Sequence, residues 1–151
     1  MATKDVNPVF VDTNILVYAN LRESPWHHQA VFALEKLRNS GNPLWVNRQV
    51  LREYLAVLTR TSLLSAPIPK ESLIEDVRAF SSAFKIAEES SETTGLLLSL
   101  LERFSIGGKQ IHDTNIVASM LSVGVRSLLT NNAADFIRFS SEIEIIDLKH
   151  L

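Results

Sequence analysis

The chain has 151 residues, which is enough for one domain with a sizeable core, and 46% of them are hydrophobic, which excludes a disordered protein. The formal net charge of −2 gives no general attraction to nucleic acid, so contacts with RNA or DNA must depend on local patches or metal ions. Because cysteine is absent, disulfides, zinc–thiolate sites and cysteine nucleophiles are excluded. No apolar run is long enough to span a bilayer, and Met1–Asn7 lacks the apolar core of a secretory signal, so we expect a cytoplasmic protein without membrane contacts.

Short apolar runs bounded by polar or turn-forming residues predict the strands of an α/β protein. The expected strands are Val9–Val11, Leu44–Val46, Phe84–Ala87, Arg126–Thr130 and Glu144–Leu148. Apolar residues at helical spacing fill the intervals between them. The expected helices are Thr13–Leu21, Trp26–Asn39, Gln49–Thr61, Lys70–Ser82, Ser91–Phe104 and Asp113–Ser122. Because strands alternate with helices, we expect a mostly parallel sheet of four or five strands with helices on both faces.

Some helix ends carry recognisable signals. Ser24 is expected to cap the second helix, with Pro25 in its first turn. Gly124 is expected to end the helix that begins at Asp113. After the fourth strand, Asp135 is expected to open a short helical segment.

Asp12 directly follows the first expected strand, and Thr13 and Asn14 come next. Open α/β sheets bind their ligands at the carboxyl ends of the strands, so Asp12 is a candidate ligand-binding carboxylate. A common alternative for an aspartate at this position is to cap the helix that follows the strand. Both roles remain open from the sequence.

Three further acids occur where the same sheet would bring them to that edge. Glu53 lies at the edge of the apolar face of its helix, although a helical glutamate is usually solvated. Asp113 lies at the centre of an apolar helical stripe, where a carboxylate is costly unless it caps the helix, pairs or binds a cation. Asp135 follows the strand-end residues Thr130-Asn131-Asn132. The simpler alternative is that Asp135 is an acid in the first turn of a helix, where the helix dipole favours negative charge.

Carboxylates that converge in one cleft repel one another unless a cation lies between them. Magnesium and manganese prefer oxygen ligands, orient phosphate groups and lower the pKa of an attacking water. We therefore expect the four acids to hold Mg²⁺ or Mn²⁺ for the hydrolysis of phosphodiester bonds. The candidate contacts to the nucleic-acid backbone are Arg48, Arg52, Arg103 and Lys109.

Four blocks of sequence resemble the PIN-domain family. They are VFVDTN at residues 9–14, Glu53 within its helix, HDTNIVA at residues 112–118, and LTNNAADF at residues 129–136. The blocks occur in the family's order, and the resemblance covers nearly the whole chain. Within the family, the chain most resembles the small VapC-type toxins of bacterial and archaeal toxin–antitoxin pairs.

The resemblance implies a three-layer α/β/α fold with a central parallel sheet, in one PIN-like domain that spans residues 1–151. It also implies a Mg²⁺- or Mn²⁺-dependent ribonuclease that forms a homodimer and is held inactive by an antitoxin whose C-terminal segment reaches into the acidic cleft. The family's acidic quartet is matched by Asp12, Glu53, Asp113 and Asp135, and its polar support positions by Thr13, Asn14, Thr130 and Asn132. Some relatives carry an acid in the region of Asn131 and Asn132, where this chain has amides.

On this interpretation Asp12 and Asp113 are the main metal ligands, directly or through water. Glu53 binds metal or orients the attacking water, and Asp135 completes the site. The hydroxyls of Thr13 and Thr130 are expected to fix the carboxylates.

Two other functions remain open. A PIN-domain protein can serve in RNA processing or DNA cleavage, or be an inactive interaction domain. A receiver-like phospho-acceptor module on a similar sheet would need an acidic pair near the end of the first strand and a lysine after a late strand. This chain has Thr130-Asn131-Asn132 after the late strand, with no lysine, so this alternative is disfavoured.

Overall fold

The computed structural model describes residues 6–60 and 64–151, which contain a five-stranded parallel sheet. The strands are β1 (Val9–Val11), β2 (Leu44–Asn47), β3 (Lys85–Ala87), β4 (Ser127–Thr130) and β5 (Glu144–Asp147). Their order across the sheet is β3-β2-β1-β4-β5. The chain therefore moves outwards from β1 to β3 and then returns to the opposite side of β1, so the winding direction reverses between β1 and β4.

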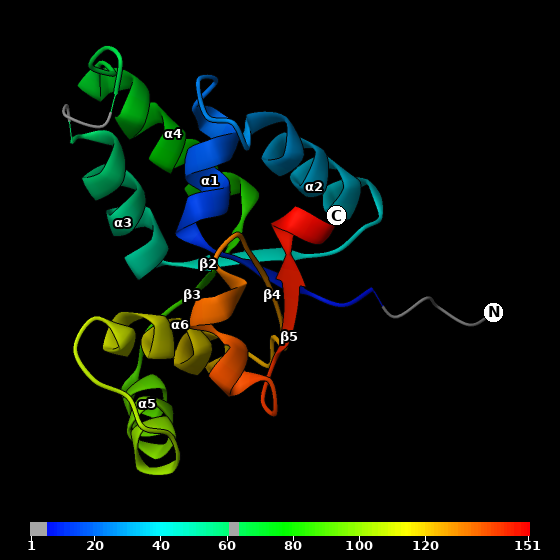
Figure 1. Cartoon of the computed structure of the whole chain (residues 1–151), viewed down its shortest axis with the longest axis vertical. Helices are drawn as coiled ribbons and strands as arrows, with labels where there is room; N and C mark the ends of the chain where they lie inside the picture. The colour runs from blue at the N-terminus through cyan, green and yellow to red at the C-terminus, as the bar shows by residue number, and fades with distance from the viewer. Residues whose placement is uncertain (1–5, 61–63) are drawn as a thin grey trace.

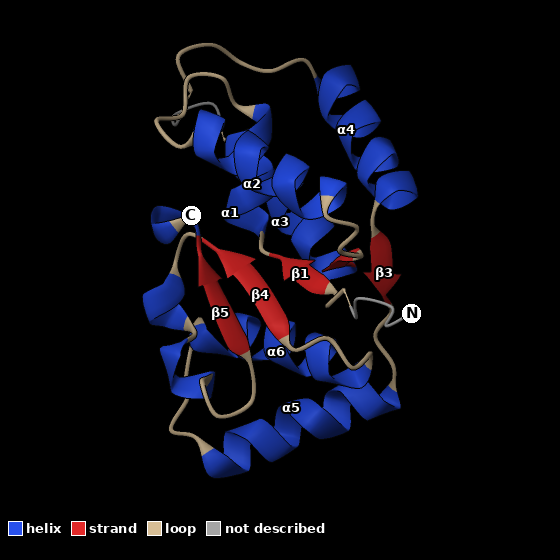
Figure 2. Cartoon of the chain, turned by 90° about the vertical axis from the view of Figure 1, so that its right-hand side faces the viewer, coloured by secondary structure: helices blue, strands red, loops and turns tan. Residues whose placement is uncertain are grey.

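Helices cover both faces of the sheet (Figures 1 and 2). They are α1 (Thr13–Asn20), α2 (His27–Asn39), α3 (Arg48–Leu58), α4 (Lys70–Ala83), α5 (Ser91–Arg103) and α6 (Gln110–Ser122). Figure 2 shows α1 to α4 on one face, with α5 and α6 together on the other. The predicted three-layer α/β/α fold is confirmed. No helix within the described ranges is both long and apolar enough to cross a membrane.

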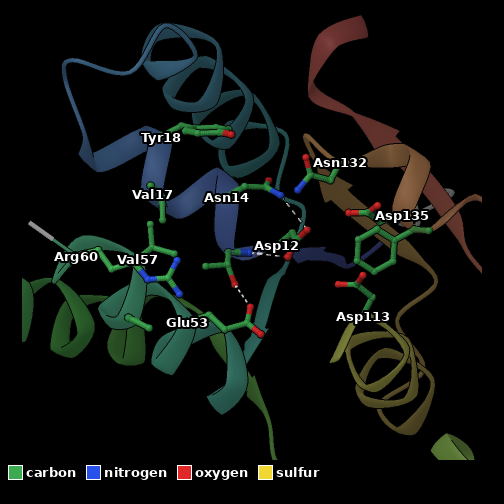
Figure 3. Close-up of a pocket in the computed structure, with 13 residues that line it drawn as sticks. Asp12, Asn14, Val17, Tyr18, Glu53, Val57, Arg60, Asp113, Asn132 and Asp135 are labelled. Atoms are coloured by element: carbon green, nitrogen blue, oxygen red, sulfur yellow. Dashed lines mark hydrogen bonds between the residues drawn. The ribbon is translucent and has the colours of Figure 1, made fainter. Parts of the chain in front are cut away.

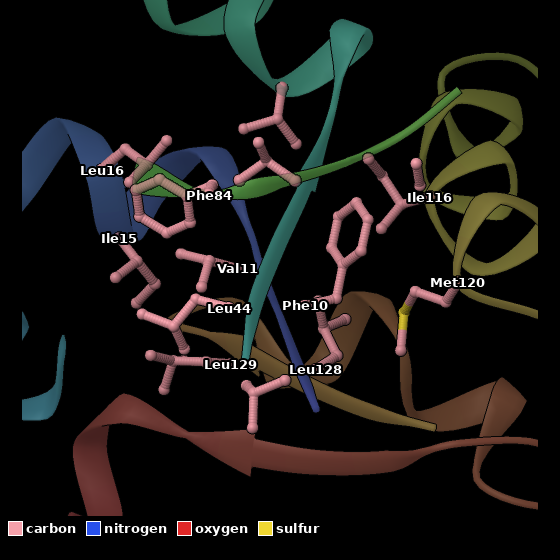
Figure 4. Packing of buried hydrophobic residues seen from close by; sticks show 14 of the residues in the cluster. Phe10, Val11, Ile15, Leu16, Leu44, Phe84, Ile116, Met120, Leu128 and Leu129 are labelled. Atoms are coloured by element: carbon pink, nitrogen blue, oxygen red, sulfur yellow. The ribbon is translucent and has the colours of Figure 1, made fainter. Parts of the chain in front are cut away.

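The middle of each central strand is apolar because helices cover the sheet on both faces. Every residue of β1 and β4 is buried. Phe10 and Leu128 point towards α6, whereas Val11 and Leu129 point towards α1 (Figure 4). Side chains from the same two strands thus fill both halves of the core, and the polar residues that follow these strands start from rigid positions.

The start of α2 differs from the prediction. The helix begins at His27, because the preceding residues form a tight turn in which the Trp26 N–H donates to Ser24 Oγ at 3.1 Å. Ser24 therefore stabilises the turn before the helix and does not cap the helix itself.

The bounds of α3 also differ. Asn47 ends β2 and caps the helix at once, since its Oδ1 accepts from the Val50 N–H at 2.9 Å. The helix therefore begins at Arg48 and ends at Leu58. Its predicted end at Thr61 lies outside the described residues.

Candidate active site

A cleft of about 380 Å³ opens at the carboxyl edge of the sheet, where the winding reverses between β1 and β4 (Figure 3). Such a reversal is where open α/β sheets bind ligands. The four acids predicted from the sequence all line it: Asp12, Glu53, Asp113 and Asp135. The predicted support residues Thr13, Asn14 and Asn132 line it too, and Thr130 contacts Asp12.

Asp12 is the buried floor of the cleft, with 8% of its surface exposed. Its Oδ1 accepts from the Thr13 N–H at 2.8 Å. Its Oδ2 accepts from the Thr130 hydroxyl at 2.8 Å and from the Asn14 amide at 3.1 Å. Asp12 is thus the N-cap of α1 as well as a wall of the cleft. A carboxylate has about four lone-pair positions, so these three donors leave about one, on Oδ1, for a ligand.

The groups that hold Asp12 are themselves fixed to the end of β4. Asn14 Oδ1 accepts from the Asn131 N–H, and Thr130 Oγ1 accepts from the Asn132 N–H, both at 3.0 Å. Because these side chains bond the backbone that follows β4, the ends of β1 and β4 form one connected polar network.

Glu53 reaches the cleft from α3 and is not a solvated surface glutamate. Its Oε2 accepts from the Thr13 hydroxyl at 2.8 Å, and its Oε1 accepts from Gln49 Nε2 at 2.8 Å. Each carboxylate oxygen therefore has one donor, which fixes the orientation of the group and leaves lone pairs for a ligand.

Asp113 enters the cleft from α6, whose start differs from the prediction. The N–H groups of residues 110–112 bond to the carbonyls of residues 107–109, so the chain already winds helically before Asp113. The helix begins at Gln110, and Asp113 is too far inside it to be the N-cap. The capping alternative is therefore wrong, and the half-buried carboxylate points into the cleft (Figure 3).

Asp135 lies at the exposed rim of the cleft. It is the last residue of a 3₁₀ turn, Ala133–Asp135, and a second 3₁₀ turn, Ile137–Phe139, follows. The expected short helical segment is therefore present, but it begins at Ala133 and not at Asp135. A three-residue turn aligns few peptide dipoles, which removes the helix-dipole explanation for this acid. The adjacent Phe136 is buried and lines the same cleft, so it anchors the turn that carries Asp135.

The electrostatics of the cleft disfavour negative charge. Burial raises the pKa of Asp12 from 3.8 to about 6. The negative charge of Glu53 also raises this pKa, whereas the hydrogen bonds from Thr130 and Thr13 lower it. Burial also raises the pKa of Asp113 to about 6, with further increases from Asp12, Asp135 and Glu53. Partial desolvation and mutual repulsion are the causes in both cases, so a cation in the cleft would relieve them.

The donor set suits a hard divalent cation, although the acids do not form a closed cage. Within the described part of the chain, no three Asp, Glu or His side chains are grouped closely enough to hold a metal ion as they stand. Mg²⁺ usually keeps several of its waters and binds proteins through one or two carboxylates. A wide cleft with four carboxylates fits a partly hydrated ion of this kind.

One end of the cleft is apolar and basic, which the sequence did not reveal. Tyr18 and Arg60 line it with Val17, Ala56 and Val57 (Figure 3). The basic residues suggested by the sequence do not line the cleft: Arg48, Arg52, Arg103 and Lys109. Two of them are paired with acids elsewhere, Arg48 with Glu88 and Arg103 with Glu142.

Comparisons with known proteins agree with this arrangement. The family described as PIN domain matches residues 9–141. The chain is 25% identical to Ribonuclease VapC48 of Mycobacterium tuberculosis over 130 residues, which cover 85% of this chain and 89% of that protein.

Solved structures also share the fold, and two of them illustrate the similarity. VapBC2 from Rickettsia felis, bound to a DNA fragment from its promoter, has 23% identity and a TM-score of 0.64, with 92% of this chain and 97% of that chain covered. A toxin–antitoxin complex from Klebsiella pneumoniae has 19% identity and a TM-score of 0.61, with 93% and 97% covered.

Proposed function

The chain belongs to the PIN-domain family, and on this basis we propose that it is a metal-dependent endoribonuclease and the toxin of a toxin–antitoxin pair. The observation that carries the proposal is the meeting of four acids, from four separate segments, at the point where the sheet reverses its winding. Similarity to Ribonuclease VapC48 supports the reaction class.

The chemistry follows from the roles that we assign to the acids. A divalent cation bound in the cleft would neutralise the phosphate and lower the pKa of the attacking water. Asp12 and Asp113 would hold the cation, directly or through water. Glu53 would bind it or orient the attacking water with the lone pairs that its two hydrogen bonds leave free. Asp135 completes the acidic wall at the rim.

The neighbouring hydroxyls keep these carboxylates in place. Thr130 donates to Asp12 and Thr13 donates to Glu53, so each acid holds its orientation before a ligand arrives. Groups that orient metal ligands in this way typically change metal affinity or activity by about 10–100-fold when they are removed.

We also propose an antitoxin and a second copy of this chain as partners. The fold is shared with VapBC2 and with a toxin–antitoxin complex, which supports the first. An antitoxin-like reading frame immediately upstream, and suppression of RNA cleavage by its purified product, are the expected results. Light scattering should give a mass twice that of one chain. A monomer in solution would contradict the proposed dimer without touching the chemistry.

The activity test uses purified protein with a total-RNA pool and with DNA, in the presence of Mg²⁺, Mn²⁺ or EDTA. We expect metal-dependent cleavage of RNA and its loss in Asp12→Asn. Glu75→Gln, an exposed change on α4 outside the cleft, is the control and should cleave as the wild type does. Wild-type cleavage by Asp12→Asn would refute the metal assignment. Cleavage of DNA alone, or of neither nucleic acid, would refute the ribonuclease proposal.

A further inference from the structure

Gln49 connects two walls of the cleft from a buried position. It lies in the first turn of α3, four residues before Glu53, and 6% of its surface is exposed. Its Nε2 donates to Glu53 Oε1 at 2.8 Å and to the backbone carbonyl of His112 at 2.9 Å. The residue after His112 is Asp113, so one side-chain amide contacts one acid directly and the segment that carries another.

The orientation of this amide is determined by its partners. Both hydrogens of Gln49 Nε2 face acceptors, and Gln49 Oε1 accepts from Asn115 Nδ2 at 2.8 Å. The second hydrogen of Asn115 Nδ2 is donated to Glu89 at 2.7 Å. A flipped Gln49 amide would set its oxygen against two acceptors and its NH₂ against a donor, so the arrangement has a single consistent solution.

The contacts are long-range in sequence, because 63 residues separate Gln49 from His112 and 66 separate it from Asn115. They join the start of α3 to the start of α6, the two helices that carry Glu53 and Asp113. The second oxygen of Glu53 is held independently by Thr13. Gln49 therefore holds Glu53 on the side of α6, while Thr13 ties the same carboxylate to the start of α1.

We propose that Gln49, oriented by Asn115, is a positioning residue that sets the placement of Glu53 relative to Asp113 and thereby the affinity of the cleft for a divalent cation. This inference rests on the proposed function. Without the Gln49 amide, Glu53 Oε1 and the His112 carbonyl lose their shared donor. Repulsion between Glu53 and Asp113 is then free to move the two acids apart, and a cation must bring them together again when it binds.

The test measures Mn²⁺ binding by calorimetry on the whole chain, together with thermal unfolding followed by circular dichroism. Gln49→Met keeps the length of the side chain and removes its hydrogen bonds. We expect it to weaken Mn²⁺ binding about 10–100-fold. Gln29→Met, the same change at an exposed position on α2, should bind Mn²⁺ as the wild type does. In the RNA assay, kcat should fall while KM for RNA stays within about twofold, because Gln49 does not line the cleft.

A double-mutant cycle with Asn115→Ala separates positioning from packing. Asn115 acts on Glu53 only through Gln49, so Asn115→Ala should weaken Mn²⁺ binding less than Gln49→Met does. The double variant should bind no more weakly than Gln49→Met alone. Additive losses would overturn the inference. If Gln49→Met does not fold, Asn115→Ala alone provides the test. Mn²⁺ binding by Asn115→Ala that equals the wild type would then refute the inference.

The outcomes also separate this inference from the function on which it rests. If Asp12→Asn abolishes Mn²⁺ binding and Gln49→Met binds as tightly as the wild type, the inference alone is refuted. A purely structural role for Gln49 would give this result together with a lower unfolding temperature. If the wild type shows no Mn²⁺ binding that depends on Asp12, the proposed function and the inference both fail.

Discussion

Burial of the Asp12 carboxylate predicts that the metal-free protein is less stable at alkaline than at mildly acidic pH. The pKa of this group is about 6 in the folded chain, against 3.8 for an ordinary aspartate. A pKa that is raised on folding gives stability that is fully present below the unfolded value and is lost as the pH rises through the folded value. The relevant window therefore lies between about pH 4 and pH 8.

The magnitude follows from the size of the shift. A difference of about two pKa units corresponds to about 3 kcal/mol in the free energy of unfolding. About half of this, ~1.4 kcal/mol, is lost between about pH 5 and pH 8. Asp12→Asn has no charge to bury, so its stability relative to the wild type should rise by that amount across the same range. The new amide also faces the Asn14 NH₂ group, but this unfavourable contact does not change with pH.

The assay is urea unfolding in EDTA at several pH values for the wild type, Asp12→Asn and the control Glu75→Gln. The diagnostic quantity is the stability difference between each variant and the wild type, because the titrating groups that do not interact with Asp12 cancel in it. If the stability difference between Asp12→Asn and the wild type stays constant with pH, the argument that burial raises the pKa of Asp12 is refuted. Addition of Mg²⁺ at about pH 8 should restore stability to the wild type and not to Asp12→Asn, since the proposed function requires Asp12 for binding of the ion.

Three further predictions concern the network, the core and the basic end of the cleft. Thr130→Val removes the hydroxyl that Asp12 accepts from and should lower the free energy of unfolding by about 1–3 kcal/mol, whereas Thr130→Ser should stay close to the wild type. Tyr54→Phe keeps the ring packing against Phe80 and loses the hydrogen bond to Asp76 at 2.7 Å, so urea unfolding should show a loss of about 1–2 kcal/mol with an unchanged m-value. In an Asp12→Asn background, Arg60→Ala should weaken RNA binding and reduce the slope of log K against log salt by about 0.7. The control Arg52→Ala, on α3 and outside the cleft, should leave the slope unchanged.

The residues that end the central strands were predictable from the sequence because the change there is abrupt. In β1 an unbroken buried run gives way to Asp12, and in β4 another ends at Thr130. Strands covered on both faces are apolar in their middle, so the polar residue that follows the apolar run marks the edge of the sheet. The local sequence was therefore sufficient to predict the part of the cleft that lies at the ends of β1 and β4.

The remaining features depend on packing between distant segments, which local sequence does not report. The start of α6 was misplaced because residues 107–109 carry none of the usual capping side chains, yet their carbonyls begin the helix. Gln49 resembles any polar residue at a helix start, and only the approach of α6 gives it a role. Arg60 follows the end of α3 without any signal, whereas Arg48 looked equally suitable and is occupied by Glu88.

The four acids differ in how firmly hydrogen bonds hold their carboxylates. This difference explains why the acids line one cleft without being grouped closely enough to hold a metal ion as they stand. Asp12 and Glu53 have donors on both carboxylate oxygens. Within the described residues, the carboxylates of Asp113 and Asp135 accept no such hydrogen bonds, and Asp135 is exposed. Donors that fix the first pair resist its movement, whereas the second pair is free to adjust by rotation about its side-chain bonds. The carboxylates of Asp12 and Glu53 would therefore meet a cation in fixed positions, whereas Asp113 can adjust to it, and this would relieve the repulsion that contributes to the raised pKa of Asp113.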